Sequence, residues 1–184
     1  MRVISGAYGG QRLKVLKGKS LRPTSEKLRE TLYDVLGDRV VGAKFLDAYA
    51  GSGAMGIEAL SRGAGEVVFL EGQRSAVELV RTNLQTLGIK SKFQIIAGPV
   101  ETGIEKLEQN GTRFHFAYLD PPYAEIREYH RILRGLGRSS IFAPQGEIVV
   151  EHSRHTRLEE RYGALARFRL LRHGDSQLGF YRLG

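Results

Sequence analysis

Four consecutive residues, Asp120-Pro121-Pro122-Tyr123, offer hydrogen-bond acceptors and an aromatic face at the end of a short apolar run, Phe114 to Leu119. Because proline fixes its own backbone and favours an extended conformation in the preceding residue, this stretch cannot turn directly into a helix. The Asp120 carboxylate and the Pro121 carbonyl can accept the two N–H bonds of an exocyclic base amine, and Tyr123 can stack on the base. Such acceptors localise the nitrogen lone pair, as transfer of a methyl group to the amine requires. The alternative is an ordinary proline-rich turn with Asp120 as a cap.

A second candidate site follows residues 45–49, where the chain reads Ala50-Gly51-Ser52-Gly53 before a helical pattern. The glycines allow a tight turn and close approach of a ligand, which would face the positive end of the helix. Glu71, twenty residues after Gly51, ends the next expected strand, where a carboxylate can bind a ribose diol. With Gly56 the loop also matches GxGxxG, so both a dinucleotide and S-adenosylmethionine fit. Only S-adenosylmethionine has an ammonium group for the strand-end carboxylate of Asp47. A plain strand-to-helix turn and an exposed strand-end acid are the alternatives.

The hydrophobic pattern predicts the elements that position these residues. Strands are expected at 44–49, 66–71, 92–97, 114–119 and 147–151. A first helix is expected where Leu28, Leu32, Val35 and Leu36 repeat at helical spacing, and further helices after residue 53 and at 75–87, 100–109 and 125–136. Thr24 or Ser25 is the expected N-cap of the first helix, and Gly37 its stop. A terminal antiparallel hairpin is expected at 166–171 and 178–183. This alternation indicates a mostly parallel, doubly wound sheet, with ligands beyond the carboxyl ends of its strands.

Composition restricts the class of protein. The chain has 184 residues, of which 41% are hydrophobic and 26% charged, as is typical of one soluble globular domain. It has no apolar stretch near the length of a membrane span and no signal-peptide pattern, so we expect a cytoplasmic protein with no membrane partner. The absence of cysteine excludes disulfides, thiolate metal sites and a cysteine nucleophile. The five histidines form no convincing ligand set, so no metal site is expected.

The positive charge is concentrated at the N-terminus. The net charge is +8, and the first 29 residues hold eight Lys and Arg residues against Glu26 alone. Such a basic arm favours a polyanionic partner, because phosphate contacts supply affinity without sequence information. Apolar residues alternate with polar ones around Gly9-Gly10, which indicates a hairpin; a solvated basic tail is the alternative. The candidate phosphate contacts in this arm are Arg2, Arg12 and Lys14.

Three segments together resemble one family. They are Leu21-Arg22-Pro23-Thr24 with Arg29-Glu30-Thr31-Leu32-Tyr33, Leu46-Asp47 with Ala50-Gly51-Ser52-Gly53, and Asp120-Pro121-Pro122-Tyr123. They look like the RsmD-like family, the bacterial guanine-N2 methyltransferases of small-subunit ribosomal RNA, and the resemblance covers nearly the whole chain. The Asp-Pro-Pro-Tyr type also occurs in N6-adenine DNA methyltransferases, so this motif does not identify the base.

The resemblance implies a class I, Rossmann-like methyltransferase with a mostly parallel seven-stranded sheet and an antiparallel C-terminal strand. It implies a basic hairpin extension at 1–22 that binds RNA and a methyltransferase domain at 23–184. The expected enzyme is monomeric and methylates guanine N2 in 16S ribosomal RNA, free or within the small subunit. Carried over by position, the residues expected to bind the methionine end of S-adenosylmethionine are Asp47, Ala50, Gly51, Ser52 and Gly53, and the residue expected to bind the ribose is Glu71. The guanine is expected to contact Asp120, Pro121, Pro122 and Tyr123. Contacts with the cofactor or with RNA phosphate are expected from Arg22, Thr24 and Arg29.

The chain departs from the family pattern in two places. Gln73 replaces the second acid usual after the ribose acid, and Gly98-Pro99-Val100 stands where related enzymes often place Asp or Asn near the adenine. Since Pro99 has no N–H, adenine recognition is expected to rest on the Val100 N–H and on apolar contacts. Three other functions stay open, namely an N6-adenine methyltransferase on RNA or DNA, an NAD-dependent oxidoreductase and a non-catalytic RNA-binding module.

Overall fold

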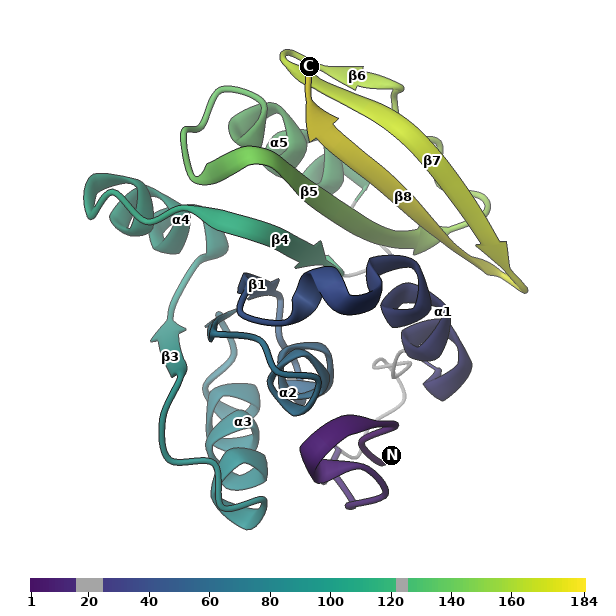
Figure 1. Cartoon of the computed structure of the whole chain (residues 1–184). Helices are drawn as coiled ribbons and strands as arrows, with labels where there is room; N and C mark the ends of the chain where they lie inside the picture. Colours follow the sequence, from purple (N-terminus) through teal and green to yellow (C-terminus); the bar gives the residue numbers. More distant parts are fainter. Residues whose placement is uncertain (16–24, 122–125) are drawn as a thin grey trace.

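The sheet has the predicted doubly wound arrangement. The computed structural model describes residues 1–15, 25–121 and 126–184 (Figure 1). Its strands are β1 (Lys44–Ala48), β2 (Glu66–Glu71), β3 (Phe93–Ala97), β4 (Phe114–Leu119), β5 (Phe142–Ser153), β6 (Arg161–Tyr162), β7 (Leu165–His173) and β8 (Ser176–Leu183). They form one sheet in the order β3-β2-β1-β4-β5-β8-β7-β6, in which β1 to β5 are parallel and the last three strands are antiparallel. The sheet has eight strands instead of the expected seven, because the two-residue β6 is too short for its sequence to show a pattern.

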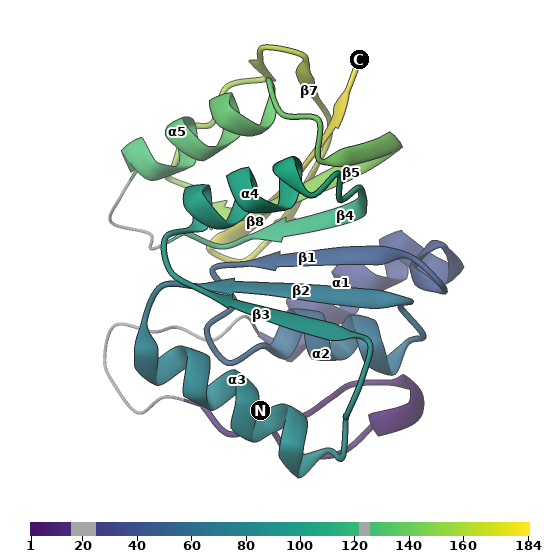
Figure 2. The same ribbon diagram turned by 90° about the vertical axis from the view of Figure 1, so that its left-hand side faces the viewer.

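Helices cover both faces of the sheet. They are α1 (Glu26–Leu36), α2 (Ala54–Ser61), α3 (Arg74–Thr86), α4 (Val100–Gln109) and α5 (Ile126–Leu136), with 3-10 turns η1 (Gly6–Tyr8) and η2 (Gly37–Val40). Apolar side chains of α1, α2 and α3 fill one core cluster, and those of α4 and α5 fill the other. Figure 2 shows α4 and α5 on one side of the strands and α2 and α3 on the opposite side. Within the described ranges, no helix is long and apolar enough to cross a membrane.

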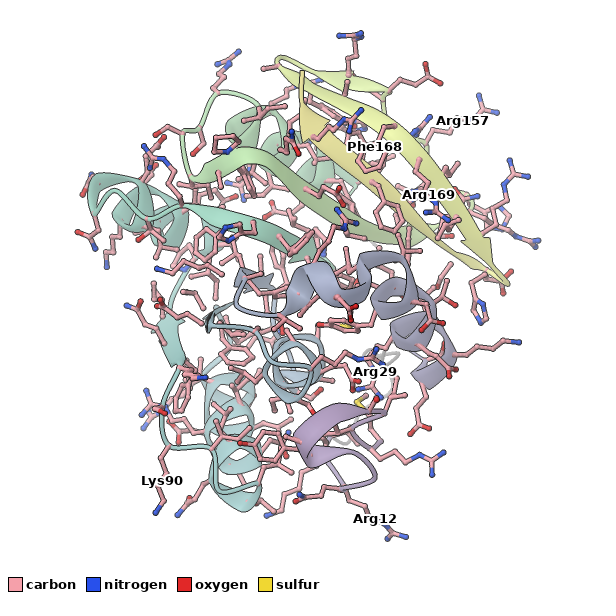
Figure 3. The ribbon with its side chains drawn as sticks, viewed as in Figure 1. Arg12, Arg29, Lys90, Arg157, Phe168 and Arg169 are labelled. Atoms are coloured by element: carbon pink, nitrogen blue, oxygen red, sulfur yellow. The ribbon has the colours of Figure 1, made fainter. Side chains whose placement is uncertain are left out.

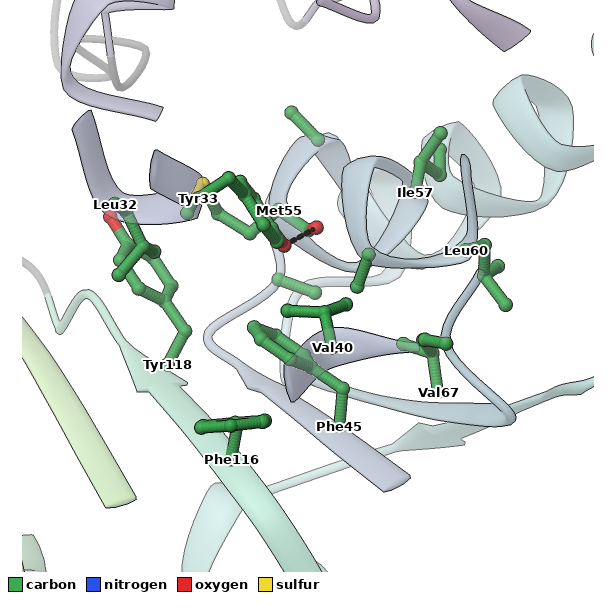
Figure 4. Close-up of a cluster of buried hydrophobic side chains, with 14 of the residues drawn as sticks. Leu32, Tyr33, Val40, Phe45, Met55, Ile57, Leu60, Val67, Phe116 and Tyr118 are labelled. Carbon is green, nitrogen blue, oxygen red and sulfur yellow. Dashed lines mark hydrogen bonds between the residues drawn. The ribbon is translucent and has the colours of Figure 1, made fainter. Parts of the chain in front are cut away.

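Helix α1 begins and ends where the sequence predicts. The Ser25 hydroxyl accepts the Leu28 N–H at 3.1 Å, and Gly37 follows the last turn with φ of 54°. The buried Tyr33 donates its hydroxyl to the Met55 carbonyl of α2 at 2.5 Å, and its ring stacks on Phe45 of β1 with 6.2 Å between centroids (Figure 4). These contacts fix α1 against both α2 and the sheet.

The N-terminal segment folds back on itself, as predicted. Arg2 and Arg12 form an isolated antiparallel β-bridge, and η1 occupies the turn between them. The two sides of the predicted hairpin are therefore joined by this bridge and do not form regular strands. Val3 is completely buried and Leu13 is 5% exposed, which anchors the segment in the core. Glu58, fully buried in α2, accepts the N–H groups of Ile4 at 2.8 Å and Ser5 at 3.1 Å. The first 15 residues are therefore packed against α2, which excludes a solvated tail there.

Candidate active site

The parallel strands end in one row of polar side chains. Ala48 of β1 pairs with Leu70 of β2 and with Leu119 of β4, and Leu119 pairs with Val150 of β5. The residues that follow these four in the chain are Tyr49, Glu71, Asp120 and Glu151. Asp47 lies one step earlier in β1 and is close enough to Glu71 and Asp120 for their charges to interact. The structure thus brings together the three acids that the sequence singled out.

Asp47 is a buried acid at the start of α2. The residue is 1% exposed, and its Oδ2 accepts the Gly56 N–H at 2.8 Å. Burial raises the pKa of Asp47 to about 8, an effect that the Gly56 hydrogen bond opposes and the Glu71 charge reinforces. A carboxyl group of this kind becomes ionised when a cation binds beside it. The arrangement therefore suits recognition of an ammonium group.

The glycine loop takes the conformation that its sequence predicts. Gly51 and Gly53 have φ of 56° and 75°, in the region that only glycine adopts freely. The Ala50 N–H bonds to the Leu70 carbonyl at 3.0 Å, and the Gly53 N–H bonds to the Ala50 carbonyl at 2.7 Å. Gly56 permits close packing of α2, since a Cβ there would lie 2.3 Å from the Phe69 ring.

Glu71 joins the glycine loop to the start of α3. Its two carboxylate oxygens accept the N–H groups of Gly51 and Gln73, each at 2.8 Å. Glu71 is 8% exposed. Its carboxylate can still accept hydrogen bonds from a ligand, because an ionised carboxyl group can accept about four of them. At the family departure noted above, Gln73 therefore contributes a backbone donor that orients the predicted ribose acid.

The segment predicted to read the adenine lies beside Glu71. The Gly98 N–H donates to the Glu71 carbonyl at 2.9 Å, and Val100 is the first residue of α4. The Val100 side chain is 4% exposed and packs in the core, so it supplies no surface of its own. Its N–H belongs to the first turn of the helix, whose N–H groups have no partner within the helix.

Asp120 and Pro121 provide the two acceptors expected for an amine. Burial, together with the charges of Glu151 and Asp47, holds the pKa of Asp120 well above its ordinary value. The Pro121 carbonyl accepts the hydroxyl of the buried Tyr129 at 3.0 Å, which fixes its orientation and leaves its second lone pair for a ligand. Pro122 and Tyr123 lie outside the described residues.

Two polar residues of this region had no role in the sequence prediction. Glu151, 3% exposed, accepts hydrogen bonds from the hydroxyls of Tyr118 and of Ser176 and faces Asp120. Its signal was its place at the end of the expected strand 147–151, the same place that Asp120 has in its own strand. The second is Asn83, which interrupts the apolar face of α3 and is 1% exposed.

Asn83 connects the N-terminal segment to the glycine loop. Its amide group donates to the Ser52 carbonyl at 2.9 Å and to the Lys14 carbonyl at 3.0 Å, and its carbonyl accepts the Lys14 N–H at 2.8 Å. Lys14 is therefore held by its backbone while its side chain is exposed. One buried amide thus sets the position of a candidate phosphate contact relative to the candidate cofactor loop.

The predicted RNA contacts differ in their exposure. Arg12 and Lys14 are exposed, and Arg2 is exposed and paired with Glu26 at 3.1 Å. Arg29 is completely buried and donates to the Arg2 carbonyl at 2.7 Å, because the N-terminal segment folds over it. In this conformation Arg29 cannot reach an external phosphate. Arg22 and Thr24 lie outside the described residues.

Comparison with known proteins gives consistent matches along the chain. The family model described as Conserved hypothetical protein 95 matches residues 1–182. YlbH of Bacillus subtilis is 35% identical over 99% of this chain and 98% of its own length. Ribosomal RNA small subunit methyltransferase D of Haemophilus influenzae is 37% identical over 67% of this chain and 64% of its own length.

Solved structures extend the match to the fold. The structure of yhhF from Escherichia coli has a TM-score of 0.85 and 27% identity and covers 100% of this chain and 97% of its own. The fold is also that of an RNA methyltransferase structure solved with S-adenosylhomocysteine, at a TM-score of 0.64 and 14% identity. The predicted class I methyltransferase fold is confirmed.

Proposed function

Because the chain belongs to the family described as Conserved hypothetical protein 95, which is the RsmD-like family that the sequence predicted, we propose that it methylates ribosomal RNA with S-adenosylmethionine. The finer proposal is transfer to the exocyclic N2 amine of a guanine in 16S ribosomal RNA, free or within the small subunit. The observation that carries the proposal is the group of Asp47, Glu71 and Asp120 with the Pro121 carbonyl at one edge of the sheet. The name of the Haemophilus influenzae relative supports the choice of RNA.

The cofactor residues fit S-adenosylmethionine in their chemistry. Asp47 would hold the ammonium group, the loop of residues 50–53 the methionine end, and Glu71 the ribose hydroxyls. The Val100 N–H is the donor available to the adenine. When bound, S-adenosylmethionine supplies a methyl group already activated by its sulfonium, so the protein has to align and desolvate the two reactants.

Asp120 and Pro121 would act on the amine. The carboxylate and the carbonyl accept its two N–H bonds, and this orients the nitrogen lone pair towards the methyl group. As the new N–C bond forms, the bond between the methyl carbon and the sulfonium sulfur would break, and the nitrogen must lose one proton. Burial and the nearby charges of Glu151 and Asp47 keep the pKa of Asp120 well above its ordinary value. The positive charges of bound S-adenosylmethionine would favour its ionised form, and a carboxylate with a raised pKa is a suitable acceptor for that proton.

The N-terminal extension of residues 1–22 is the proposed RNA-binding element that precedes the methyltransferase domain 23–184. Arg12 and Lys14 support this proposal because both are exposed and carry no ion pair among the described residues. The hydrogen bonds between Asn83 and the Lys14 backbone would keep this RNA-binding element in a fixed position beside the cofactor loop.

Identification of the methylated nucleoside tests the proposal. The protein is incubated with labelled S-adenosylmethionine and either unmodified 16S ribosomal RNA or small subunits that carry it, and the digested RNA is analysed by mass spectrometry. We expect N2-methylguanosine. Detection of N6-methyladenosine would identify adenine, and not guanine, as the target base. Absence of any methylated nucleoside from both substrates would contradict the proposal.

A further inference from the structure

The end of the sheet formed by β7 and β8 carries an exposed aromatic side chain among arginines. Phe168 is 42% exposed, and Arg169 and Arg182 beside it are also exposed. Figure 3 shows Phe168 and Arg169 on the ribbon of β7, with no helix drawn over them. The side chains of α1 cover the same face of the sheet further along, so this surface is the uncovered part of an otherwise packed face.

A β-bulge produces the exposure of Phe168. The register of β7 against β8 shifts between Arg167, which pairs with Tyr181, and Arg169, which pairs with Phe180. Phe168 is the extra residue, and a bulge turns such a residue out of the regular alternation. Its ring stands edge-on to the buried Phe180, with 6.2 Å between centroids and 61° between planes.

The arginines are held in place by the aromatic rings. The Arg182 guanidinium lies 4.9 Å from the Phe168 centroid, and the Arg169 guanidinium lies 5.9 Å from the Phe180 centroid. Among the described residues, no acid forms an ion pair with either arginine. Glu147, which is opposite Arg182 in the β5–β8 ladder, pairs instead with Arg39 at 2.6 Å. The surface therefore keeps uncompensated positive charge in a defined geometry.

The charge of the whole C-terminal part agrees with this local picture. Residues 152–184 contain seven arginines and three acids, so a second basic region lies at the opposite end of the chain from the N-terminal arm. The strand register gives its distance from the candidate site. Arg182 is opposite Glu147, four residues or about 13 Å before Glu151 along β5, and β7 is the second neighbour of β5, about 10 Å away at ordinary strand spacing.

We infer that the surface of Phe168, Arg169 and Arg182 binds an unpaired stretch of the RNA substrate, with the arginines on phosphates and the Phe168 ring against a base. This inference rests on the proposed function. Unpaired RNA is the favoured occupant because an aromatic ring can stack only on a base that is free of its helix, while arginines supply the phosphate contacts.

Ring and charge are tested separately. Phe168→Leu keeps an apolar side chain but removes the ring, and Phe168→Tyr keeps the ring. We expect RNA binding of Phe168→Leu to weaken by roughly 5-fold or more, since stacking on a base contributes about 1–3 kcal/mol, and Phe168→Tyr to bind like the parent. The probes are unmodified 16S ribosomal RNA, small subunits and a short single-stranded oligonucleotide.

The arginines are tested by the salt dependence of binding. The double variant Arg169→Gln, Arg182→Gln should reduce the slope of log affinity against log salt by about 1.4, at about 0.7 for each single-strand phosphate contact. The matched control is Lys90→Gln, Lys106→Gln, which removes the same charge from exposed positions outside this surface. All variants should bind S-adenosylhomocysteine with unchanged affinity and unfold at the parent's temperature.

Two results would overturn the inference. One is equal RNA affinity and salt slope for the arginine variant and the lysine control, with Phe168→Leu equal to the parent. The other is a loss of RNA affinity that follows a loss of thermal stability, which would make the cluster a support of the hairpin only. If the parent methylates RNA and the variants do so equally, the inference alone fails, whereas a parent that neither binds nor methylates RNA removes the proposed function too.

Discussion

The raised pKa of Asp47 predicts that cofactor binding releases a proton. With a pKa of about 8, the free protein holds Asp47 mainly in its neutral form at pH 7. A bound ammonium group favours the carboxylate, so binding lowers this pKa and expels the proton. Affinity should therefore rise as the pH increases towards 8. Above that pH the gain levels off, because Asp47 is then mainly ionised in the free protein as well.

The size of the effect follows from the same value. One pH unit below a pKa of about 8, roughly one tenth of the Asp47 side chains are ionised. Affinity at pH 7 should then be about 10-fold below its limit, which is about 1.4 kcal/mol, and at pH 6 about 100-fold below it. About 0.9 proton should leave for each ligand bound at pH 7.

Calorimetric titration with S-adenosylhomocysteine at pH 6, 7 and 8 measures both quantities. Repeating the titration in buffers with different heats of ionisation counts the protons. Asp120 also has a raised pKa and lies near Asp47, so the Asp47→Asn variant is needed to assign the proton. Its amide carbonyl can still accept the Gly56 N–H, so the fold should persist while the pH dependence is lost. Constant parent affinity from pH 6 to 8, with no proton released, would refute the reasoning.

Three further variants separate the roles of the site. Asp120→Asn should slow methyl transfer by about 100-fold or more in single-turnover assays, the usual range for loss of a proton acceptor, and leave S-adenosylhomocysteine affinity within about 3-fold; loss of cofactor binding would count against it. Glu71→Gln should weaken cofactor affinity by about 10-fold or more, since bonds to charged groups contribute about 1.5–3 kcal/mol, with RNA affinity unchanged; cofactor titrations equal to the parent's would reject this role. Asn83→Ala removes three hydrogen bonds of about 1 kcal/mol each and should lower the unfolding midpoint by about 6–12 °C, compared with the exposed Gln85→Ala on the same helix; equal midpoints for the two would exclude a structural link.

Most of the fold could be predicted because local pattern and tertiary role agree in a doubly wound sheet. The strand predicted at 66–71 is β2 with the same bounds, since its apolar run is buried on both faces. The strand predicted at 147–151 is longer in the structure, because β5 starts at Phe142 and continues through Pro144 and Gly146. Gln145, with φ of 63°, lies in that irregular part, where the pairing of β4 with β5 also shifts in register. Proline and glycine are rare in regular strands, so this part of β5 has no strand pattern in its sequence.

The site could be predicted only where its residues end strands. Asp47, Glu71 and Asp120 follow apolar runs, and parallel strands bring such ends together. The burial of Arg29 depends on the N-terminal segment folding over α1, and the bond from Asn83 to Lys14 joins residues 69 positions apart. No local pattern contains information of that range. Both depend on how the N-terminal segment packs against the helices.

The row of acids also distinguishes between the two cofactors that the glycine loop admits. The pyrophosphate of a dinucleotide would place negative charge near Asp47, Glu71, Asp120 and Glu151, where burial already disfavours the ionised forms of Asp47 and Asp120. Two unit charges of the same sign 4 Å apart repel by about 4 kcal/mol at an effective dielectric constant of 20. S-adenosylmethionine instead brings an ammonium and a sulfonium, and each positive charge relieves the mutual repulsion of the carboxylates. The same glycine loop would serve either ligand, so in this protein the electrostatics of the strand ends favour a methyl donor over a hydride carrier.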